Sequence, residues 1–195
     1  MRQAEIKRKT AETEIKLSIN LDGSGQAEIE TPVPFMNHML NLLARHSLID
    51  LKVIASGDIE IDAHHTVEDL GIVLGQALKQ ALGDKKGVTR YGSVTLPMDE
   101  ALLQVAIDLG GRSHLSFAVD NLKDKVGDFD TELVAEFFQA LVREAGMGLH
   151  IRRISGENTH HIIEGIFKAL ARSLREAVTI DERIDGLLTT KEKFD

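Results

Sequence analysis

Two histidine doublets, each with a glutamate four positions after its first histidine, are the groups in this sequence with the clearest capacity for chemistry. They are His64-His65 with Glu68 and His160-His161 with Glu164. On a helix, residues i and i+4 share one face, while the second histidine of a doublet points about 100° away. One doublet therefore cannot easily chelate a single ion, and the spacing predicts two metal ions, each with one histidine from each doublet. Imidazole and carboxylate ligands without thiolate suit Mn, Fe, Co, Ni or Zn, and the ligand types alone do not choose among them.

The duplication of this pattern favours a metal site over an ordinary surface. A lone histidine pair on a helix is usually solvated, whereas here the same pair and glutamate recur 96 positions later. Asp62 and Asn158 stand two residues before the doublets and are favoured N-cap types, so each doublet is expected in the first turn of a long helix. A purely structural metal site is the open alternative.

The segments around the doublets repeat as well, which indicates two copies of one structural unit. Apolar residues that alternate with polar ones predict strands at 15–21 and 103–109, and apolar clusters predict helices near 39–43 and 137–142. Short strands are expected at 49–53 and 147–151. After each doublet, apolar residues at helical spacing predict an amphipathic helix, through 70–81 and 163–174.

These elements predict a layered fold. Every helix must bury one face, so the expected class is α/β (α+β), with two tandem pseudo-symmetric βαβα-type repeats. The first half is expected over residues 1–93, with the first doublet, and the second half over 94–195, with the second doublet. Together they are expected to form one compact unit. The tail after Ile180 has no clear periodicity and is expected to be loosely structured until a ligand or neighbour orders it.

Composition narrows the class of protein. The 195 residues include 23 Lys and Arg against 31 Asp and Glu, a formal net charge of −8, and only 4% are aromatic. An acidic chain without Trp is a poor candidate for binding nucleic acid. The absence of Cys removes disulfides and thiolate sites, and no apolar run is long enough for a membrane span. We therefore expect a cytoplasmic protein with neither a nucleic acid nor a membrane as partner.

Several motifs carry a resemblance to a known family. His64-His65-Thr66-Val67-Glu68-Asp69, His160-His161-Ile162-Ile163-Glu164 and Phe35-Met36-Asn37-His38-Met39-Leu40 resemble the imidazoleglycerol-phosphate dehydratases of histidine biosynthesis. Further matching stretches are Thr10 to Thr13, Asp99 to Leu102 and Asp108 to Arg112, so that the likeness covers essentially the whole chain. It implies a lyase with two Mn²⁺ per subunit that dehydrates imidazole glycerol phosphate to imidazole acetol phosphate. It also implies a ribosomal protein S5 domain 2-like fold, with helices between two mixed sheets, and self-association into a 24-subunit shell with active sites at subunit contacts.

The resemblance also implies two ligand sets. One metal would take His38, His65, His160 and Glu164, and the other would take His64, Glu68, Glu136 and His161. The repeat supports these sets, because His38 and Glu136 stand 26 and 24 residues before their doublets. Position 136 is His in some relatives, and Glu makes the second site more anionic. Asn37 replaces a usual Asp, with an expected effect on the surroundings of His38.

The implied chemistry explains the need for metals. The substrate loses a hydroxyl beside its ring and a proton from the next carbon, which no carbonyl acidifies. Two cations on the ring nitrogens would hold a metal-bridged imidazolate, which expels the hydroxyl to give a diazafulvene-like intermediate. A carboxylate then removes the proton. By resemblance Glu12 is the acid/base, although by sequence alone it is a solvated strand residue, and the metal-bound carboxylates Glu68 and Glu164 could share the proton transfer.

Phosphate recognition is expected from scattered cations, because no Gly-x-x-x-x-Gly-Lys loop is present. By resemblance the phosphate contacts are Arg90, Arg112, Lys168 and Lys191, with Thr189 or Thr190 donating a hydroxyl. His46 lies near enough to His38 to touch the substrate, although a packing or surface role is favoured for it, as for His114 and His150. The substrate would also contact Glu12 and the metal-binding residues His38, His64, His65, Glu68, His160 and His161. Relatives tend to carry Ser-Ser-Lys-Gly where this chain has Thr189-Thr190-Lys191-Glu192, a departure that leaves the role of the tail open.

Two other functions fit part of the pattern. A binuclear metallohydrolase would use the same histidines and glutamates to activate water, but the near-full-length resemblance does not favour it. Metal storage, or a metal-stapled shell, would explain the ligands without explaining Glu12, Arg90 or Arg112.

Overall fold

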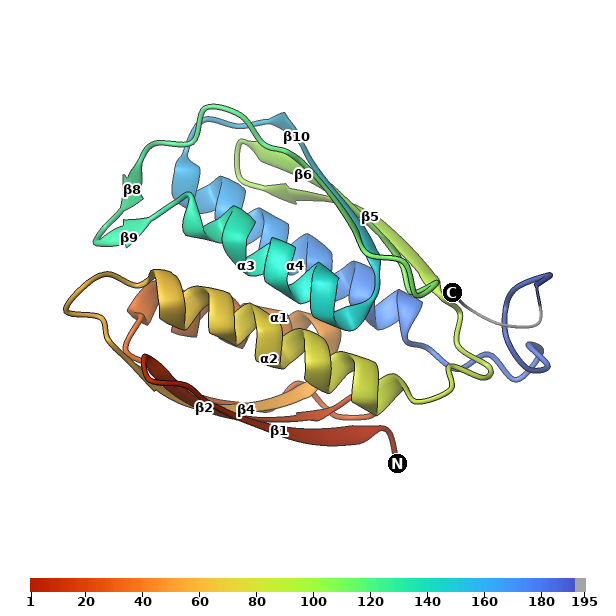
Figure 1. Ribbon diagram of the computed structural model, residues 1–195. Coiled ribbons are helices and arrows are strands. Elements are labelled where there is room, and N and C mark those ends of the chain that lie inside the picture. The colour runs from red at the N-terminus through yellow and green to blue at the C-terminus, as the bar shows by residue number, and fades with distance from the viewer. Residues whose placement is uncertain (192–195) are drawn as a thin grey trace.

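Two four-stranded mixed sheets enclose four helices (Figure 1), in a computed structural model that describes residues 1–191. The first sheet has the order β1 (Gln3–Lys9), β2 (Thr13–Asn20), β4 (Asp50–Gly57), β3 (Ala27–Glu30). The second has the order β5 (Tyr91–Met98), β6 (Ala101–Asp108), β10 (Gly148–Ser155), β7 (His114–Ala118), and β8 (Lys125–Val126) pairs with β9 (Phe129–Asp130) in a small hairpin. In both sheets only the last pair of strands is parallel. The two halves thus have one topology, as the repeat predicts.

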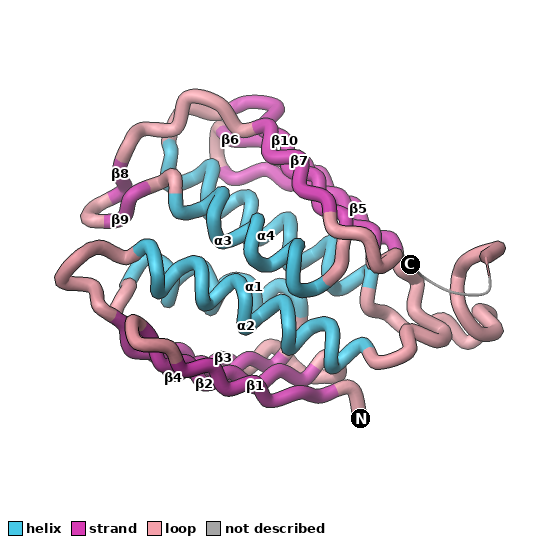
Figure 2. The backbone as a smooth tube through the Cα atoms, viewed as in Figure 1, coloured by secondary structure: helices cyan, strands magenta, loops and turns pink. Residues whose placement is uncertain are grey.

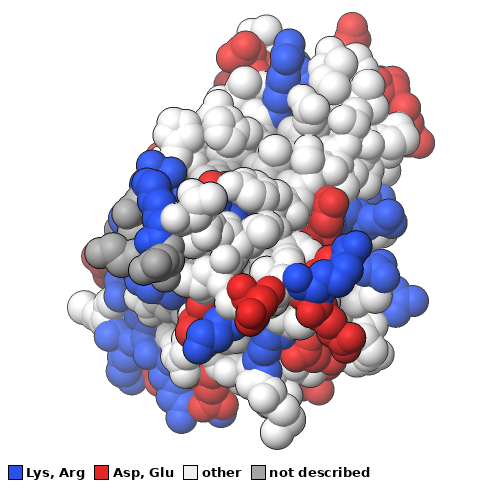
Figure 3. Space-filling model, turned by 90° about the vertical axis from the view of Figure 1, so that its right-hand side faces the viewer, with Lys and Arg blue, Asp and Glu red and all other residues white. Residues whose placement is uncertain are grey.

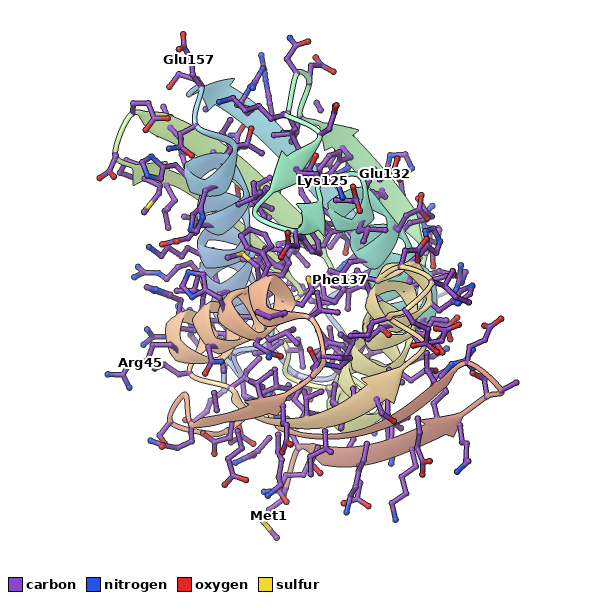
Figure 4. The ribbon with its side chains drawn as sticks, turned by 90° about the vertical axis from the view of Figure 1, so that its left-hand side faces the viewer. Met1, Arg45, Lys125, Glu132, Phe137 and Glu157 are labelled. Atoms are coloured by element: carbon purple, nitrogen blue, oxygen red, sulfur yellow. The ribbon has the colours of Figure 1, made fainter. Side chains whose placement is uncertain are left out.

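The helices form the two inner layers (Figure 2). They are α1 (Pro34–Ser47), α2 (His64–Leu82), α3 (Leu133–Ala145) and α4 (Thr159–Ala177). The first two cover the first sheet and the last two cover the second, and across the middle α2 packs on α3 while α1 packs on α4. Figure 4 shows Phe137 pointing into the space between these layers, where its ring lies 5.6 Å from that of Phe167. The predicted fold class is confirmed.

Small residues bring α2 close to α3. A Cβ atom on Gly71 would lie 2.5 Å from the carbonyl oxygen of Phe137, and one on Gly75 would lie 2.7 Å from that of Leu141. Because such distances are below van der Waals contact, only glycine allows the two backbones this approach. The close contact fixes the first turn of α2, where His64 and His65 lie, relative to the second half.

Both doublets lie in the first turn of a long helix, and one of the two predicted caps is correct. Asn158 is the N-cap of α4, and its side-chain oxygen accepts hydrogen bonds from the backbone N–H groups of His160 (3.0 Å) and His161 (3.4 Å). In α2 the N-cap is instead Ala63, and Asp62, one residue earlier, accepts a hydrogen bond from His64 N (2.7 Å). The reason is the connection before the helix, which spans 58–63 here but only 156–158 before α4.

The strands and surface follow the predicted alternation. In β2, Ile15, Leu17 and Ile19 are buried against the helices, while Glu14 and Lys16 face outward. Charged side chains are densest over the lower half of Figure 3, where the first sheet lies. On that sheet, Lys52 of β4 forms an ion pair with Glu28 of β3. No helix within residues 1–191 is long and apolar enough to span a bilayer.

The tail from 181 to 191 forms no helix or strand. It still has fixed contacts, since Gly87 donates a hydrogen bond to the carbonyl of Gly186 (2.8 Å) and Asp181 donates one to the carbonyl of Gly87 (2.9 Å). The first strand of the second sheet, β5, begins at Tyr91. The division of the two halves between residues 93 and 94 stays a prediction.

Candidate metal centre and active site

Three predicted ligands meet where α1 packs on α4. The Nε2 atoms of His38, on α1, and His160, on α4, each lie 3.1 Å from one carboxylate oxygen of Glu164. The candidate ligand atoms of these three residues all lie within 4.8 Å of one another. Two imidazole nitrogens and a carboxylate suit a divalent transition-metal ion such as Mn²⁺. The residues present therefore fit the expected metal.

Glu164 is held in its charged form. Its side chain is only 10% exposed, and Lys168, one turn further along α4, places Nζ 2.6 Å from its second oxygen. Burial by itself raises the pKa of Glu164, but the hydrogen bonds from Lys168 and His38 outweigh this effect and lower the pKa to about 2. Lys168 thus neutralises one oxygen of the carboxylate and leaves the other facing the two histidines.

His46 lies on α1, two turns beyond His38, on the side that faces α4. Burial, together with the charges of Lys168 and Arg172, lowers the pKa of His46, so its ring stays neutral at pH 7. This placement is compatible both with the packing role favoured for it and with contact to a substrate beside Lys168.

His65, the fourth residue expected at this metal, does not join the group. It belongs to α2, which packs on α3, and its Nδ1 lies 3.0 Å from Asp58 and 3.8 Å from Glu12. The hydrogen bond that His65 donates to Asp58 raises the pKa of His65. Within one chain the first ligand set is therefore incomplete.

The second expected ligand set is not assembled within one chain either. His64 and Glu68 lie in the first turns of α2, and Glu136 is exposed in the first turn of α3. Glu68 lies 3.6 Å from Arg143 of α3. His161, on α4, donates a 2.7 Å hydrogen bond from Nδ1 to Glu100. Across residues 1–191, no second group of three possible metal ligands comes together.

Glu12 lies in the turn between β1 and β2, beside the start of α2, and is not a regular strand residue. Its backbone N–H donates to the hydroxyl of Thr10 (3.1 Å), and its carbonyl accepts from Asp58 N (3.1 Å). The carboxyl side chain stays 53% exposed. The flanking hairpin is tied to α2 by the buried Asp69, which contacts the hydroxyl of Thr13.

Lys168 lies beside Glu164, but the other predicted phosphate contacts lie at a different corner of the fold. Arg90 is held by Asp108 (2.7 Å) and donates to the carbonyl of Leu188 (2.9 Å), immediately before Thr189. Its guanidinium also lies against Gly110, in the turn that carries the exposed Arg112. The predicted residues Thr189, Thr190 and Lys191 follow in the tail, whereas Glu192 lies outside the described residues.

This corner is far from the histidine group in the same chain. The backbone N–H of Arg90 donates to the carbonyl of Ala177, the last residue of α4, while His160 lies in the first turn of that helix. At a rise of 1.5 Å per residue, these two ends are about 25 Å apart. Arg90 and His160 of one chain therefore lie at opposite ends of one long helix.

The sequence did not predict the contacts that three carboxylates make near the histidines and Glu12. Asp58 holds His65, Asp69 holds the hairpin of Glu12, and Glu100 holds His161. The repeat contained the signal for Glu100, which stands 88 positions after Glu12, the same offset as the two alternating strands. The hydrogen bond from His161, with that from the backbone of Asn158, lowers the pKa of Glu100 to about 2.

Two further expectations concern neighbouring residues. The side-chain oxygen of Asn37 accepts a hydrogen bond from the hydroxyl of Thr31 (2.7 Å), and its amide group donates one to the carbonyl of Thr31 (3.0 Å), in the turn before α1. The effect of Asn37 on His38 stays a prediction. His114 and His150 are exposed on the second sheet with ring centres 5.3 Å apart, in keeping with surface roles.

Comparisons with known proteins show which family this chain is similar to. The family model of imidazoleglycerol-phosphate dehydratase matches residues 31–174. A protein of that name from Geobacter sulfurreducens is 57% identical over 193 residues, 99% of each chain, and one from Shouchella clausii is 61% identical over 190 residues, 97% of each chain.

Two solved structures match the fold. The crystal structure of the Staphylococcus aureus dehydratase aligns with a TM-score of 0.84 and 45% identity, covering 92% of this chain and 99% of that one. The Pyrococcus furiosus structure aligns with a TM-score of 0.83 and 36% identity, covering 96% and 99%. This chain therefore belongs to the imidazoleglycerol-phosphate dehydratase family, the hydro-lyases of histidine biosynthesis.

Proposed function

We propose that this chain dehydrates imidazole glycerol phosphate to imidazole acetol phosphate with two Mn²⁺ per subunit. The observation that carries the proposal is the group of His38, His160 and Glu164, within 4.8 Å of one another, in a chain of this family. The ligand sets expected from the sequence remain the proposed ones, with His65 completing this group and with His64, Glu68, Glu136 and His161 forming the other.

The protein's own residues would move and hold protons. When bound, two divalent cations would hold the imidazole ring of the substrate as its anion, which favours loss of the neighbouring hydroxyl. Glu12 is the proposed acid/base, since its carboxyl group is 53% exposed and lies beside His65 without a fixed hydrogen bond. Glu164 is held as a carboxylate by Lys168, and Glu68 is half-exposed, so both remain candidates for sharing the proton transfer.

The phosphate is proposed to bind to a neighbouring subunit. Lys168 is the one proposed phosphate contact near the histidine group in the same chain, because Arg90 lies about 25 Å away along α4. A neighbour would therefore supply Arg90, Arg112 and the tail residues Thr189, Thr190 and Lys191. This separation supports the proposed shell of 24 subunits with shared sites. The cytoplasm is the proposed compartment, in line with a biosynthetic role.

One assay separates the candidate functions. The purified chain is incubated with Mn²⁺ and imidazole glycerol phosphate, and both the ketone product and free phosphate are measured. Ketone without phosphate release is expected for the dehydratase. Phosphate release would indicate a metallohydrolase, and bound metal with neither product would indicate metal storage or a structural site.

A further inference from the structure

Glu12 and Glu100 occupy the same position in the two halves. Each is the last residue before a central strand, β2 for Glu12 and β6 for Glu100. Each is also the carboxylate of that turn nearest to the second histidine of its own half. Glu12 lies 3.8 Å from Nδ1 of His65, and Glu100 lies 2.7 Å from Nδ1 of His161.

The two carboxylates differ in how firmly they are held. One oxygen of Glu100 accepts hydrogen bonds from the backbone N–H groups of Asn158 (2.9 Å) and Glu157 (3.3 Å), and the other oxygen contacts His161. Those two amides directly precede α4, so Glu100 is fixed to the start of the helix that carries the histidine. The carboxylate of Glu12 lies beyond hydrogen-bond distance of His65, and Asp58 holds that ring instead, at 3.0 Å.

A carboxylate on one imidazole nitrogen determines what the other nitrogen can do. When Glu100 accepts a hydrogen bond from the proton-bearing Nδ1 of His161, the Nε2 atom keeps its lone pair free to bind a metal. Among the described residues, the nearest carboxylate to Nε2 is that of the exposed Asp99, at 3.7 Å, too far to accept a hydrogen bond from Nε2 and so favour a proton there. His38 and His160 likewise present Nε2 to their shared site.

We propose that Glu100 is a positioning residue, which holds His161 in the tautomer and orientation that bind its metal ion. The two glutamates at this repeated position would therefore have different roles. Glu100, held by hydrogen bonds, orients the metal ligand His161, while Glu12, which is not held in this way, stays available for proton transfer. The inference rests on the proposed function, because it assumes that His161 binds a metal.

The test replaces Glu100 by glutamine. In Glu100→Gln the side-chain oxygen can still accept from the amides of Asn158 and Glu157, but its NH₂ group faces Nδ1 of His161 and favours the tautomer with a proton on Nε2. We expect one of the two Mn²⁺ sites to lose about 10- to 100-fold in affinity, with the other unchanged. Free Mn²⁺ is followed by electron paramagnetic resonance during titration of the full-length assembled protein.

A matched control separates position from charge. Glu157→Gln removes the same charge from the neighbouring exposed residue and should leave both Mn²⁺ affinities at the parent value. The thermal midpoint of metal-free Glu100→Gln should stay close to that of the metal-free parent, and millimolar Mn²⁺ should restore its turnover.

Each result has one consequence. Unchanged Mn²⁺ binding in Glu100→Gln, or an equal loss in Glu157→Gln, would overturn the positioning role. So would a large fall in the metal-free midpoint with both sites weakened alike, because Glu100 would then serve only the fold. A parent chain that binds no Mn²⁺ would overturn the proposed function itself, a result visible before any variant is made.

Discussion

Two variants with little activity alone, His160→Ala and Arg112→Ala, should regain activity when they assemble into the same shell. His160 lies in the first turn of α4, whereas Arg112 lies two residues beyond Gly110, against which the guanidinium of Arg90 packs at the other end of that helix. Arg90 and His160 are about 25 Å apart along α4, more than the length of the proposed substrate, and Arg112 follows the turn beside Arg90. If both residues serve one substrate molecule, as proposed, they come from different chains.

The expected recovery of activity follows from the share of sites that combine intact residues from the two variants. In shells with equal numbers of both variants, about 25% of sites have an intact His160 from one chain and an intact Arg112 from another, and none do if both must come from one chain. The two variants are coexpressed with different affinity tags and purified on both tags in sequence. Ketone formation at low substrate concentration is then compared with that of each variant alone.

The control pair is His160→Ala with Glu164→Gln. These residues meet at 3.1 Å within one chain, so no mixed shell contains a complete group and activity should stay at the baseline. Doubly tagged shells of His160→Ala and Arg112→Ala that show no recovery would refute the shared site, as would recovery in the control pair.

Three other expectations can be tested on the same protein. Glu12→Gln should lower kcat by about 100-fold or more, while Mn²⁺ content and particle size stay at parent values; near-parent turnover would remove Glu12 from the mechanism. Hydrogen bonds to Asp58 and Glu100 raise the pKa of His65 and His161, respectively, so protons should compete with metal from a higher pH than at ordinary histidines. Bound Mn²⁺, measured after dialysis, should fall as the pH drops through about 7 to 6, and equal occupancy at pH 5 and 8 would contradict this. Gly71→Ala should lower the free energy of unfolding, because a Cβ 2.5 Å from the carbonyl of Phe137 costs about 1–3 kcal/mol, more than the gain of about 1 kcal/mol in helix propensity. A thermal midpoint at or above that of the parent would show that α2 and α3 can separate without loss.

The sequence by itself determined the elements and their repetition. Alternation at 15–21 and 103–109 encodes β2 and β6, and Asn158 encodes the start of α4, because strand faces and helix caps depend on residues only a few positions apart. The same local reasoning placed both doublets in first helical turns. It missed by one residue at Asp62, where a longer connection moves the cap to Ala63.

Only the tertiary structure decided which of these residues meet. His38 and Glu164 are 126 positions apart and come together because α1 packs on α4, a pairing that no local periodicity specifies. The contact of Glu100 with His161 likewise depends on the turn between β5 and β6 reaching the start of α4. The distance between Arg90 and His160 is also a property of the fold, set by the length of α4. Because these two residues lie at opposite ends of one helix, only packing between chains would bring them to one substrate, as proposed, and the order of residues within a chain does not specify that packing.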